Sequence, residues 1–226
     1  MQIHENIEKY IEVLINSDDI YSLIISAPQG LGKTSTVLSK LSEMGFIEDQ
    51  NYLYQSGYMT ALRLYDFLSR SRILEIPKIL IFDDIDSLLS NKTSLALLKS
   101  ALSEARGKRV VAYESKGVVE RSFEFNGKII LITNNLSGNR NLKPLLDRAI
   151  VYNFESDPQE LMAYIEGNLD KFSGDLSDDQ KESVWDKVRR FVDSPDFSLR
   201  SVGRAFAFYR NDPENWYDLW RKSMKK

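Results

Sequence analysis

Two glycines, a lysine and a threonine stand close together in the stretch SAPQGLGKTST, at residues 26–36. Gly30 and Gly32 can adopt positive φ angles and leave room for phosphate oxygens against the backbone. Lys33 would bring a positive charge to the outer phosphates, and the hydroxyl of Thr34 is a suitable ligand for Mg²⁺. These residue types at this spacing predict a site for a nucleoside triphosphate and magnesium.

The phosphate-binding loop (P-loop) pattern G-x-x-x-x-G-K-[ST] is met except at its first position, where Ala27 replaces glycine. An apolar run precedes it and a helical pattern begins at Lys33, so backbone N–H groups and the positive end of a helix can converge on phosphates. The alternative is a glycine-rich turn that binds nothing. The residues expected at the nucleotide are Ala27, Pro28, Gln29, Gly30, Leu31, Gly32, Lys33, Thr34 and Ser35.

A pair of carboxylates closes the apolar run KILIFDD, at residues 78–84. In a parallel sheet the carboxyl end of such a strand lies where ligands bind. We expect Asp83 to hold Mg²⁺ through water and Asp84 to act as the base that orients the attacking water. The alternative is that both aspartates cap the following helix.

Positioning these groups requires strands that end at one edge of a sheet. Apolar runs alternate with helical patterns along the first part of the chain, which predicts an α/β fold: a P-loop NTPase parallel sheet with helices on both faces. The strands are expected at 21–26, 51–56, 78–84, 128–135 and 149–154, with Thr60 capping the helix after the second.

The pattern changes near residue 156. Asp157-Pro158 and Asp212-Pro213 each place an N-cap before a proline, and SDDQ at 177–180 fits a capping box. Helices are expected to start near residues 158, 178, 198 and 213, without strands between them. We therefore predict a core domain at 1–155 and a small all-helical lid domain at 156–226.

The composition of the chain argues against several classes of function. A net charge of -3 argues against a surface that binds nucleic acid everywhere, although local basic patches remain possible. The chain has no cysteine and one histidine, His4, which argues against thiolate and histidine metal sites. The acidic first stretch and the lack of a long apolar run predict no signal peptide and no membrane span, and therefore a cytoplasmic protein.

With the P-loop and Asp83-Asp84 followed by a third polar-ended strand, the chain resembles the AAA+ ATPases over about residues 20–210. The resemblance implies ATP and Mg²⁺ as cofactors, with Lys33 and Asp84 catalytic. In this family an asparagine, called sensor 1, touches the γ-phosphate or the attacking water. IILITNN offers Asn134, with Asn135 in reserve; the alternative is a pair of turn-forming asparagines.

Two arginines match further family features. LKPLLDRAIVYNF at 142–154 resembles the segment in which an arginine reaches the nucleotide of a neighbouring subunit, which implies Arg148 as this finger and a homo-oligomeric ring or open arc. SLRSVGRAFAFYR at 198–210 resembles the sensor 2 helix, which implies that Arg200, or else Arg204, reads the γ-phosphate from the lid. The alternatives are a local pair with Asp147 and a solvated charge.

Three features depart from the family pattern. Asp84 stands where the family usually has glutamate, and withdrawal of the base by about 1 Å can cost on the order of 10²-fold in rate. The segment expected before the first strand is short, which predicts an abbreviated adenine-side segment, and no appended recognition domain is expected. Either a shift of the backbone compensates for the shorter side chain, or ATP hydrolysis is slow and the protein works as a molecular timer.

Two stretches are candidates for contact with a polymer. Tyr58 and Met59 follow the second strand, where many family members carry a pore loop, and would grip a client polypeptide or nucleic acid. Residues 105–128 read as a hairpin around Lys116 and Arg121, with five basic residues against two glutamates between 106 and 121. The alternatives are local packing and an ordinary solvated hairpin.

The sequence thus predicts an oligomeric AAA+-type ATPase, a motor or switch acting on DNA or on a DNA-bound protein in a replication or mobile-element setting. The choice of DNA rests on analogy between folds. One alternative is a remodeller or unfoldase that acts on polypeptide. Another is a small-molecule kinase or nucleotide-gated switch.

Overall fold

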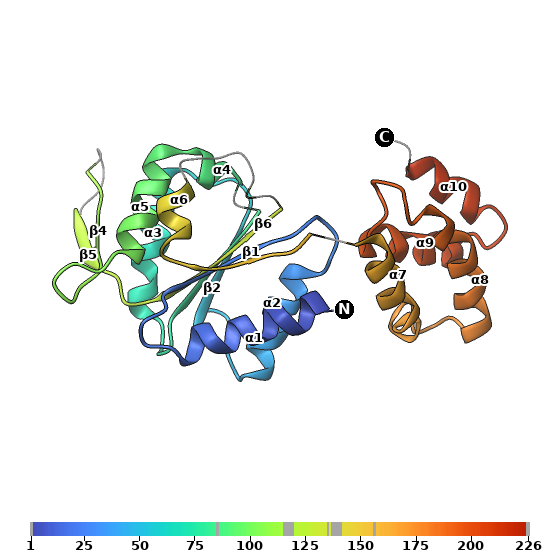
Figure 1. Cartoon of the computed structure of the whole chain (residues 1–226), viewed down its shortest axis with the longest axis horizontal. Helices are drawn as coiled ribbons and strands as arrows, with labels where there is room; N and C mark the ends of the chain where they lie inside the picture. The colour runs from blue at the N-terminus through green and yellow to red at the C-terminus, as the bar shows by residue number, and fades with distance from the viewer. Residues whose placement is uncertain are drawn as a thin grey trace. The chain divides into compact units, whose positions relative to one another are not determined.

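The computed structural model describes residues 2–84, 86–114, 120–134, 136, 142–155 and 157–224, with only the backbone described for Gln2, Asp86 and Ser87. The chain divides into two compact units (Figure 1). The sheet unit comprises Ile3–Ala27 and Lys33–Phe154. The helical unit comprises Glu155–Lys226 together with Pro28–Gly32 and Met1–Gln2.

The sheet unit is built on five parallel strands in the order β2-β3-β6-β1-β7, which confirms the expected sheet. Each strand falls within the range expected for it and is slightly shorter. They are β1 (Ser22–Ser26), β2 (Tyr52–Ser56), β3 (Ile79–Asp83), β6 (Lys128–Thr133) and β7 (Ile150–Asn153).

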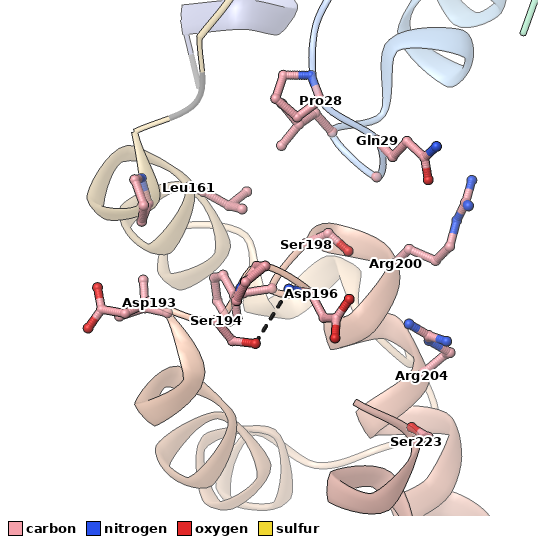
Figure 2. Close-up of a pocket in the computed structure, with 16 residues that line it drawn as sticks. Pro28, Gln29, Leu161, Asp193, Ser194, Asp196, Ser198, Arg200, Arg204 and Ser223 are labelled. Atoms are coloured by element: carbon pink, nitrogen blue, oxygen red, sulfur yellow. Dashed lines mark hydrogen bonds between the residues drawn. The ribbon is translucent and has the colours of Figure 1, made fainter. Parts of the chain in front are cut away.

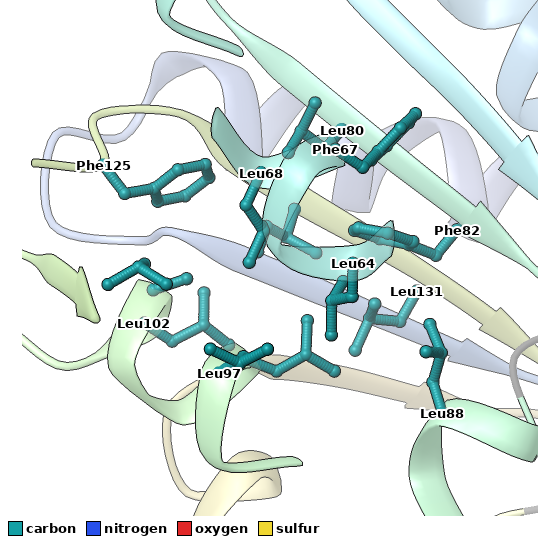
Figure 3. Packing of buried hydrophobic residues seen from close by; sticks show 14 of the residues in the cluster. Leu64, Phe67, Leu68, Leu80, Phe82, Leu88, Leu97, Leu102, Phe125 and Leu131 are labelled. Atoms are coloured by element: carbon teal, nitrogen blue, oxygen red, sulfur yellow. The ribbon is translucent and has the colours of Figure 1, made fainter. Parts of the chain in front are cut away.

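Helices cover both faces of this sheet (Figure 1). Alternate strand residues point to opposite faces, so the central apolar strands need cover on both sides. On one face Leu80, Phe82 and Leu131 pack against leucines of the helices (Figure 3). That face carries α3 (Ala61–Arg70), α4 (Asp86–Ser90), α5 (Lys92–Leu102) and α6 (Lys143–Leu146), and the other carries α1 (Gln2–Asn16) and α2 (Lys33–Glu43).

A small antiparallel hairpin, β4 (Val110–Ala112) and β5 (Ser122–Glu124), is inserted before β6. Aromatic contacts hold it against α3, because the ring of Tyr65 lies 5.1 Å from that of Phe123 and 5.6 Å from that of Tyr113. The hairpin predicted for residues 105–128 is therefore present. Its tip, which includes Lys116, lies outside the described residues.

The helical unit contains α7 (Pro158–Glu166), α8 (Asp178–Val188), α9 (Leu199–Asn211) and α10 (Trp216–Ser223). Asp157 caps α7, and Ser177 with Gln180 forms the expected capping box on α8. The helix expected near residue 213 begins instead at Trp216. The carboxylate of Asp212 accepts a hydrogen bond from the backbone N–H of Asn215 at 3.1 Å, so this residue closes a turn before the helix.

Candidate nucleotide-binding site

The carboxyl ends of three adjacent strands bring the predicted site residues together. In the ladder, Ser26 at the end of β1 pairs with Thr133 of β6, and Asp83 at the end of β3 pairs with Ile132. Asn134 follows β6 directly. Asp83 and Asn134 therefore meet at the same sheet edge as the first turn of α2.

Lys33 begins α2 and is buried, with 7% of its surface exposed. Its Nζ donates to the carbonyl oxygen of Ala27 at 2.6 Å and to Oδ1 of Asn134 at 3.0 Å. Ala27, the residue that departs from the P-loop pattern, thus presents its backbone oxygen to the lysine. Both acceptors are neutral, so they can yield to an anion that offers the ammonium group a charged partner.

Asp83 is buried and accepts three hydrogen bonds. Its Oδ2 accepts from the hydroxyl of Thr34 at 2.7 Å and from that of Tyr54 at 2.9 Å, while its Oδ1 accepts from the backbone N–H of Asp84 at 3.0 Å. Thr34 and Asp83, predicted as the magnesium pair, are therefore in direct contact. Hydroxyl and carboxylate oxygens are hard donors of the kind that Mg²⁺ prefers.

Asp84 turns away from the strand with a positive φ of 51°, an angle that aspartate tolerates better than most residues. Its side chain is exposed, and its Oδ1 accepts a hydrogen bond from the side-chain nitrogen of Asn134 at 3.2 Å. The structure thus brings Asp84 and Asn134 together. Asn135 lies outside the described residues.

The turn between β1 and α2 needs its glycines. Gly30 and Gly32 adopt φ angles of 75° and 76°, as the sequence predicted they could. The carbonyl oxygen of Gly30 accepts a hydrogen bond from the N–H of Leu199 at 3.0 Å. A β-carbon on Gly30 would lie 2.7 Å from Cβ of Ser198, so this position also has no room for a side chain.

Within the helical unit, the turn lines a cavity of about 630 Å³ (Figure 2). Pro28, Gln29, Gly30 and Leu31 form one part of its wall, and the start of α9 forms another. Arg200 and Arg204 extend from exposed positions of α9 into this lining (Figure 2). Both sensor 2 candidates therefore lie near the turn, and Arg200 is the one drawn beside Gln29.

Arg148 lies near the amino ends of the strands, whereas Lys33 lies at their carboxyl ends. Arg148 precedes β7, whose first residue pairs with Leu23 near the start of β1, whereas Lys33 follows the end of β1. The length of β1 separates the two residues by about 15 Å along the strand direction. The exposed Arg148 donates to the hydroxyl of Ser103 at 2.7 Å and to the carbonyl oxygen of Pro144.

The positive charge of the hairpin is more strongly compensated than its sequence indicated. Lys108 pairs with Glu124 at 2.9 Å, and Arg121 pairs with Glu114 at 3.4 Å. Arg109 is buried. It donates hydrogen bonds to two backbone carbonyl oxygens, and its guanidinium lies 3.9 Å from the centre of the Tyr21 ring. Burial lowers the pKa of Arg109, and its charge serves the fold rather than a partner.

The two residues of the candidate pore loop have different environments. Tyr58 is 80% exposed, whereas Met59 is 7% exposed and belongs to the core beneath α3. The position of Met59 does not support its prediction as a client contact. Tyr58 lies beside a surface pocket that Arg63 and Arg70 of α3 also line.

Tyr54 is the site residue that sequence reasoning missed. No motif includes it, and only its place on β2, opposite Ile81 and two residues before the strand ends, hints that its side chain approaches the carboxyl edge. Burial, followed by its hydrogen bond to Asp83, raises the pKa of Tyr54. Its hydroxyl therefore stays protonated, as a donor, across the neutral range.

The described residues fit magnesium held jointly with a nucleotide. They contain no group of three or more histidine, cysteine, aspartate or glutamate side chains that could hold a metal by themselves. Magnesium at nucleotide sites typically takes one or two carboxylates and completes its shell with phosphates and water. Thr34 and Asp83 would hold the ion, while Lys33 would face the phosphates.

Solved structures share this architecture, a five-stranded parallel sheet with helices on both faces followed by a helical region, and so confirm the predicted fold class. The RuvB Holliday junction branch migration motor of Thermotoga maritima is similar with a TM-score of 0.54 and 18% identity, over 99% of this chain and 68% of that one. The Orc1 protein of Aeropyrum pernix, solved in complex with DNA, is similar with a TM-score of 0.57 and 13% identity, over 99% and 65%. At these identities the likeness concerns the fold alone.

In sequence, the chain is 35% identical over 128 residues to an uncharacterised 36.7 kDa protein of the nrdC-mobD intergenic region of Enterobacteria phage T4. The match covers 53% of this chain and 38% of the phage protein. No family model matches the chain. Among the helices formed by the described residues, none combines the length and apolar character needed to span a bilayer.

Proposed function

We propose that this chain binds ATP with Mg²⁺ and hydrolyses it as an AAA+-type ATPase. The observation that carries the proposal is the convergence of Lys33, Thr34, Asp83 and Asn134, from three separate stretches of the chain, at one sheet edge. Such an edge is where parallel α/β sheets bind ligands. The AAA+ fold supports the same conclusion.

Each residue then has a role set by its chemistry. Lys33 and the N–H groups of the turn bind the phosphates, while Thr34 and Asp83 bind the metal. Asp84 is the base that orients the attacking water, and the amide of Asn134 positions both that carboxylate and the γ-phosphate. Arg200, or Arg204, contacts the γ-phosphate from the helical domain, whose proposed boundary lies at 155/156.

The active assembly in this proposal is a homo-oligomer. Arg148 lies about 15 Å along β1 from its own P-loop, which supports a role at the nucleotide of a neighbouring subunit. Its contacts with Ser103 and Pro144 hold the guanidinium at the surface in a fixed direction. An arginine supplied in this way contributes about 10³ to 10⁵ in rate in other phosphoryl-transfer proteins.

The proposed client is DNA or a DNA-bound protein. Two fold neighbours, a branch migration motor and a protein solved in complex with DNA, support this choice, and a phage relative fits a mobile-element setting. Arg121 remains available because exposed ion pairs are worth only about 0–1 kcal/mol and can exchange for phosphate contacts. A polypeptide client, contacted by Tyr58, would be the outcome if DNA has no effect.

Magnesium-dependent nucleotide binding tests the proposal. Wild-type protein should bind a fluorescent ATP analogue more tightly with Mg²⁺ than with EDTA, and release phosphate from ATP. Lys33→Ala should abolish hydrolysis and weaken binding at least tenfold, whereas Lys40→Ala, in the same helix but paired with Glu12, should change neither. Wild-type protein without magnesium-dependent affinity, or an unaffected Lys33→Ala variant, would contradict the function.

A further inference from the structure

Asp83 is the centre of a small hydrogen-bond cluster. A carboxylate has about four lone-pair sites. Among the described residues, the hydroxyls of Thr34 and Tyr54 and the N–H of Asp84 occupy three of them. One lone-pair site remains on the carboxylate. It could accept a hydrogen bond from one metal-bound water.

Tyr54 makes a contribution to this arrangement that differs from that of Thr34. A threonine beside the metal must share its hydroxyl between the ion and the carboxylate, whereas the hydroxyl of Tyr54, on the adjacent strand β2, donates to the carboxylate without being a proposed metal ligand. The parallel β2–β3 register fixes the approach, since Tyr54 lies opposite Ile81, two residues before Asp83. Two donors on Oδ2 and one on Oδ1 fix the rotation of the Asp83 side chain.

We propose that Tyr54 is a positioning residue for magnesium, which orients the Asp83 carboxylate that would hold the ion. This inference rests on the proposed function, because it needs a magnesium nucleotide at Thr34 and Asp83. Its chemistry is that of an outer-shell hydrogen bond, and loss of such a bond typically costs about 10- to 100-fold in metal affinity.

The test compares Tyr54→Phe with Tyr52→Phe in the full chain. Tyr52 is the control because it lies two residues earlier on the same strand and pairs with Ile79, farther from Asp83; its side chain is buried, whereas that of Tyr54 is partly buried. For each protein, the affinity for a fluorescent ATP analogue is measured in EDTA and across a Mg²⁺ titration. The ratio of the two affinities comes from one preparation, so partial loss of stability does not alter it.

We expect Tyr54→Phe to raise the half-saturating Mg²⁺ concentration about tenfold and to leave the affinity in EDTA unchanged, while Tyr52→Phe matches wild type. In an Asp83→Asn background, Tyr54→Phe should have no further effect on the Mg²⁺ response. An unchanged Mg²⁺ response in Tyr54→Phe, or an equal shift in Tyr52→Phe, overturns the inference. If wild type itself shows no Mg²⁺ response, it is the proposed function that fails.

Discussion

The Nζ atom of Lys33 lies 3.0 Å from Oδ1 of Asn134, and the same amide donates its N–H to Asp84 at 3.2 Å. A single asparagine therefore connects the lysine proposed to bind phosphate with the proposed base. An amide suits this place because it offers an acceptor to the cation and a donor to the carboxylate. An aliphatic side chain at this position could not form a hydrogen bond with either Lys33 or Asp84.

Replacing this amide should separate binding from chemistry. In Asn134→Ala, Lys33 and the turn still bind phosphate, so ATP affinity should stay within about threefold, whereas hydrolysis should fall about 10²-fold because Asp84 loses its orienting donor. Nucleotide titration and steady-state phosphate release measure the two effects. Equal losses in both would show that Asn134 acts in binding alone.

The length of the acidic side chain at position 84 should control the rate. Asp84→Asn keeps a residue that tolerates the φ of 51° but removes the base, so hydrolysis should fall at least 10²-fold with binding retained. Asp84→Glu extends the carboxylate by one methylene and should speed hydrolysis about tenfold if the short aspartate limits the rate. A slower Asp84→Glu variant would mean that the backbone already positions aspartate well.

Mixed assemblies should reveal a shared site. Arg148→Ala subunits keep an intact P-loop, and Lys33→Ala subunits keep the arginine, so each preparation alone should be inactive. Mixing them should restore part of the ATPase activity, because some interfaces then combine an intact P-loop with an intact arginine. No recovery at any mixing ratio would argue that Arg148 pairs only within its own chain.

Charge reversal on the hairpin should weaken DNA binding. The pair Lys116→Glu and Arg121→Glu removes two positive charges and adds two negative ones, so affinity for DNA should fall and its dependence on salt should become shallower. ATP affinity without DNA should be unchanged. As a control, Lys187→Glu alters a cation that lies over aromatic rings of the helical unit. Fluorescence anisotropy of labelled DNA measures the effect, and an unchanged affinity would exclude this hairpin as the contact.

Gly30 should be less tolerant of a methyl group than Gly45. Both have positive φ, 75° and 82°, so alanine costs about 1–2 kcal/mol at either site. Only at Gly30 does the added carbon meet Ser198, which adds about 1–3 kcal/mol of overpacking. Urea unfolding, monitored by circular dichroism, measures the loss of unfolding free energy in each variant. The fluorescence of Trp185, Trp216 and Trp220 reports on the helical unit.

Adding Ser198→Gly to Gly30→Ala should recover most of the excess cost, because glycine is nearly as good an N-cap as serine. If Gly30→Ala and Gly45→Ala prove equally destabilised, the close approach to Ser198 has no energetic weight.

The local features of this protein could be predicted from the sequence because each depends on residues a few positions apart. The cap at Thr60, the capping box at Ser177 and the strand ending at Asp83 involve contacts within one turn or one strand. The glycine-rich turn is equally local, since positive φ at Gly30 and Gly32 follows from the lack of a β-carbon. The candidate phosphate site could therefore be predicted without knowledge of the fold.

Long-range relationships were decided by the tertiary structure. Whether the hydroxyl of Tyr54 reaches Asp83 depends on the order and register of β2 and β3, and no local pattern marks Tyr54 for that contact. Likewise, Met59 and Tyr58 are neighbours in sequence, yet packing beneath α3 buries one and exposes the other. The charge of the hairpin was also misjudged, because ion pairs and the burial of Arg109 depend on residues far apart in the chain.

The sequence by itself thus determined the chemistry available at the end of β1, through residue types at fixed spacing. The tertiary structure determined which side chains share a hydrogen bond, a cavity or a surface with that chemistry. The physical reason is that backbone conformation responds to neighbours within a few residues, whereas side-chain partners are fixed only when strands pair in one register and helices pack on the sheet.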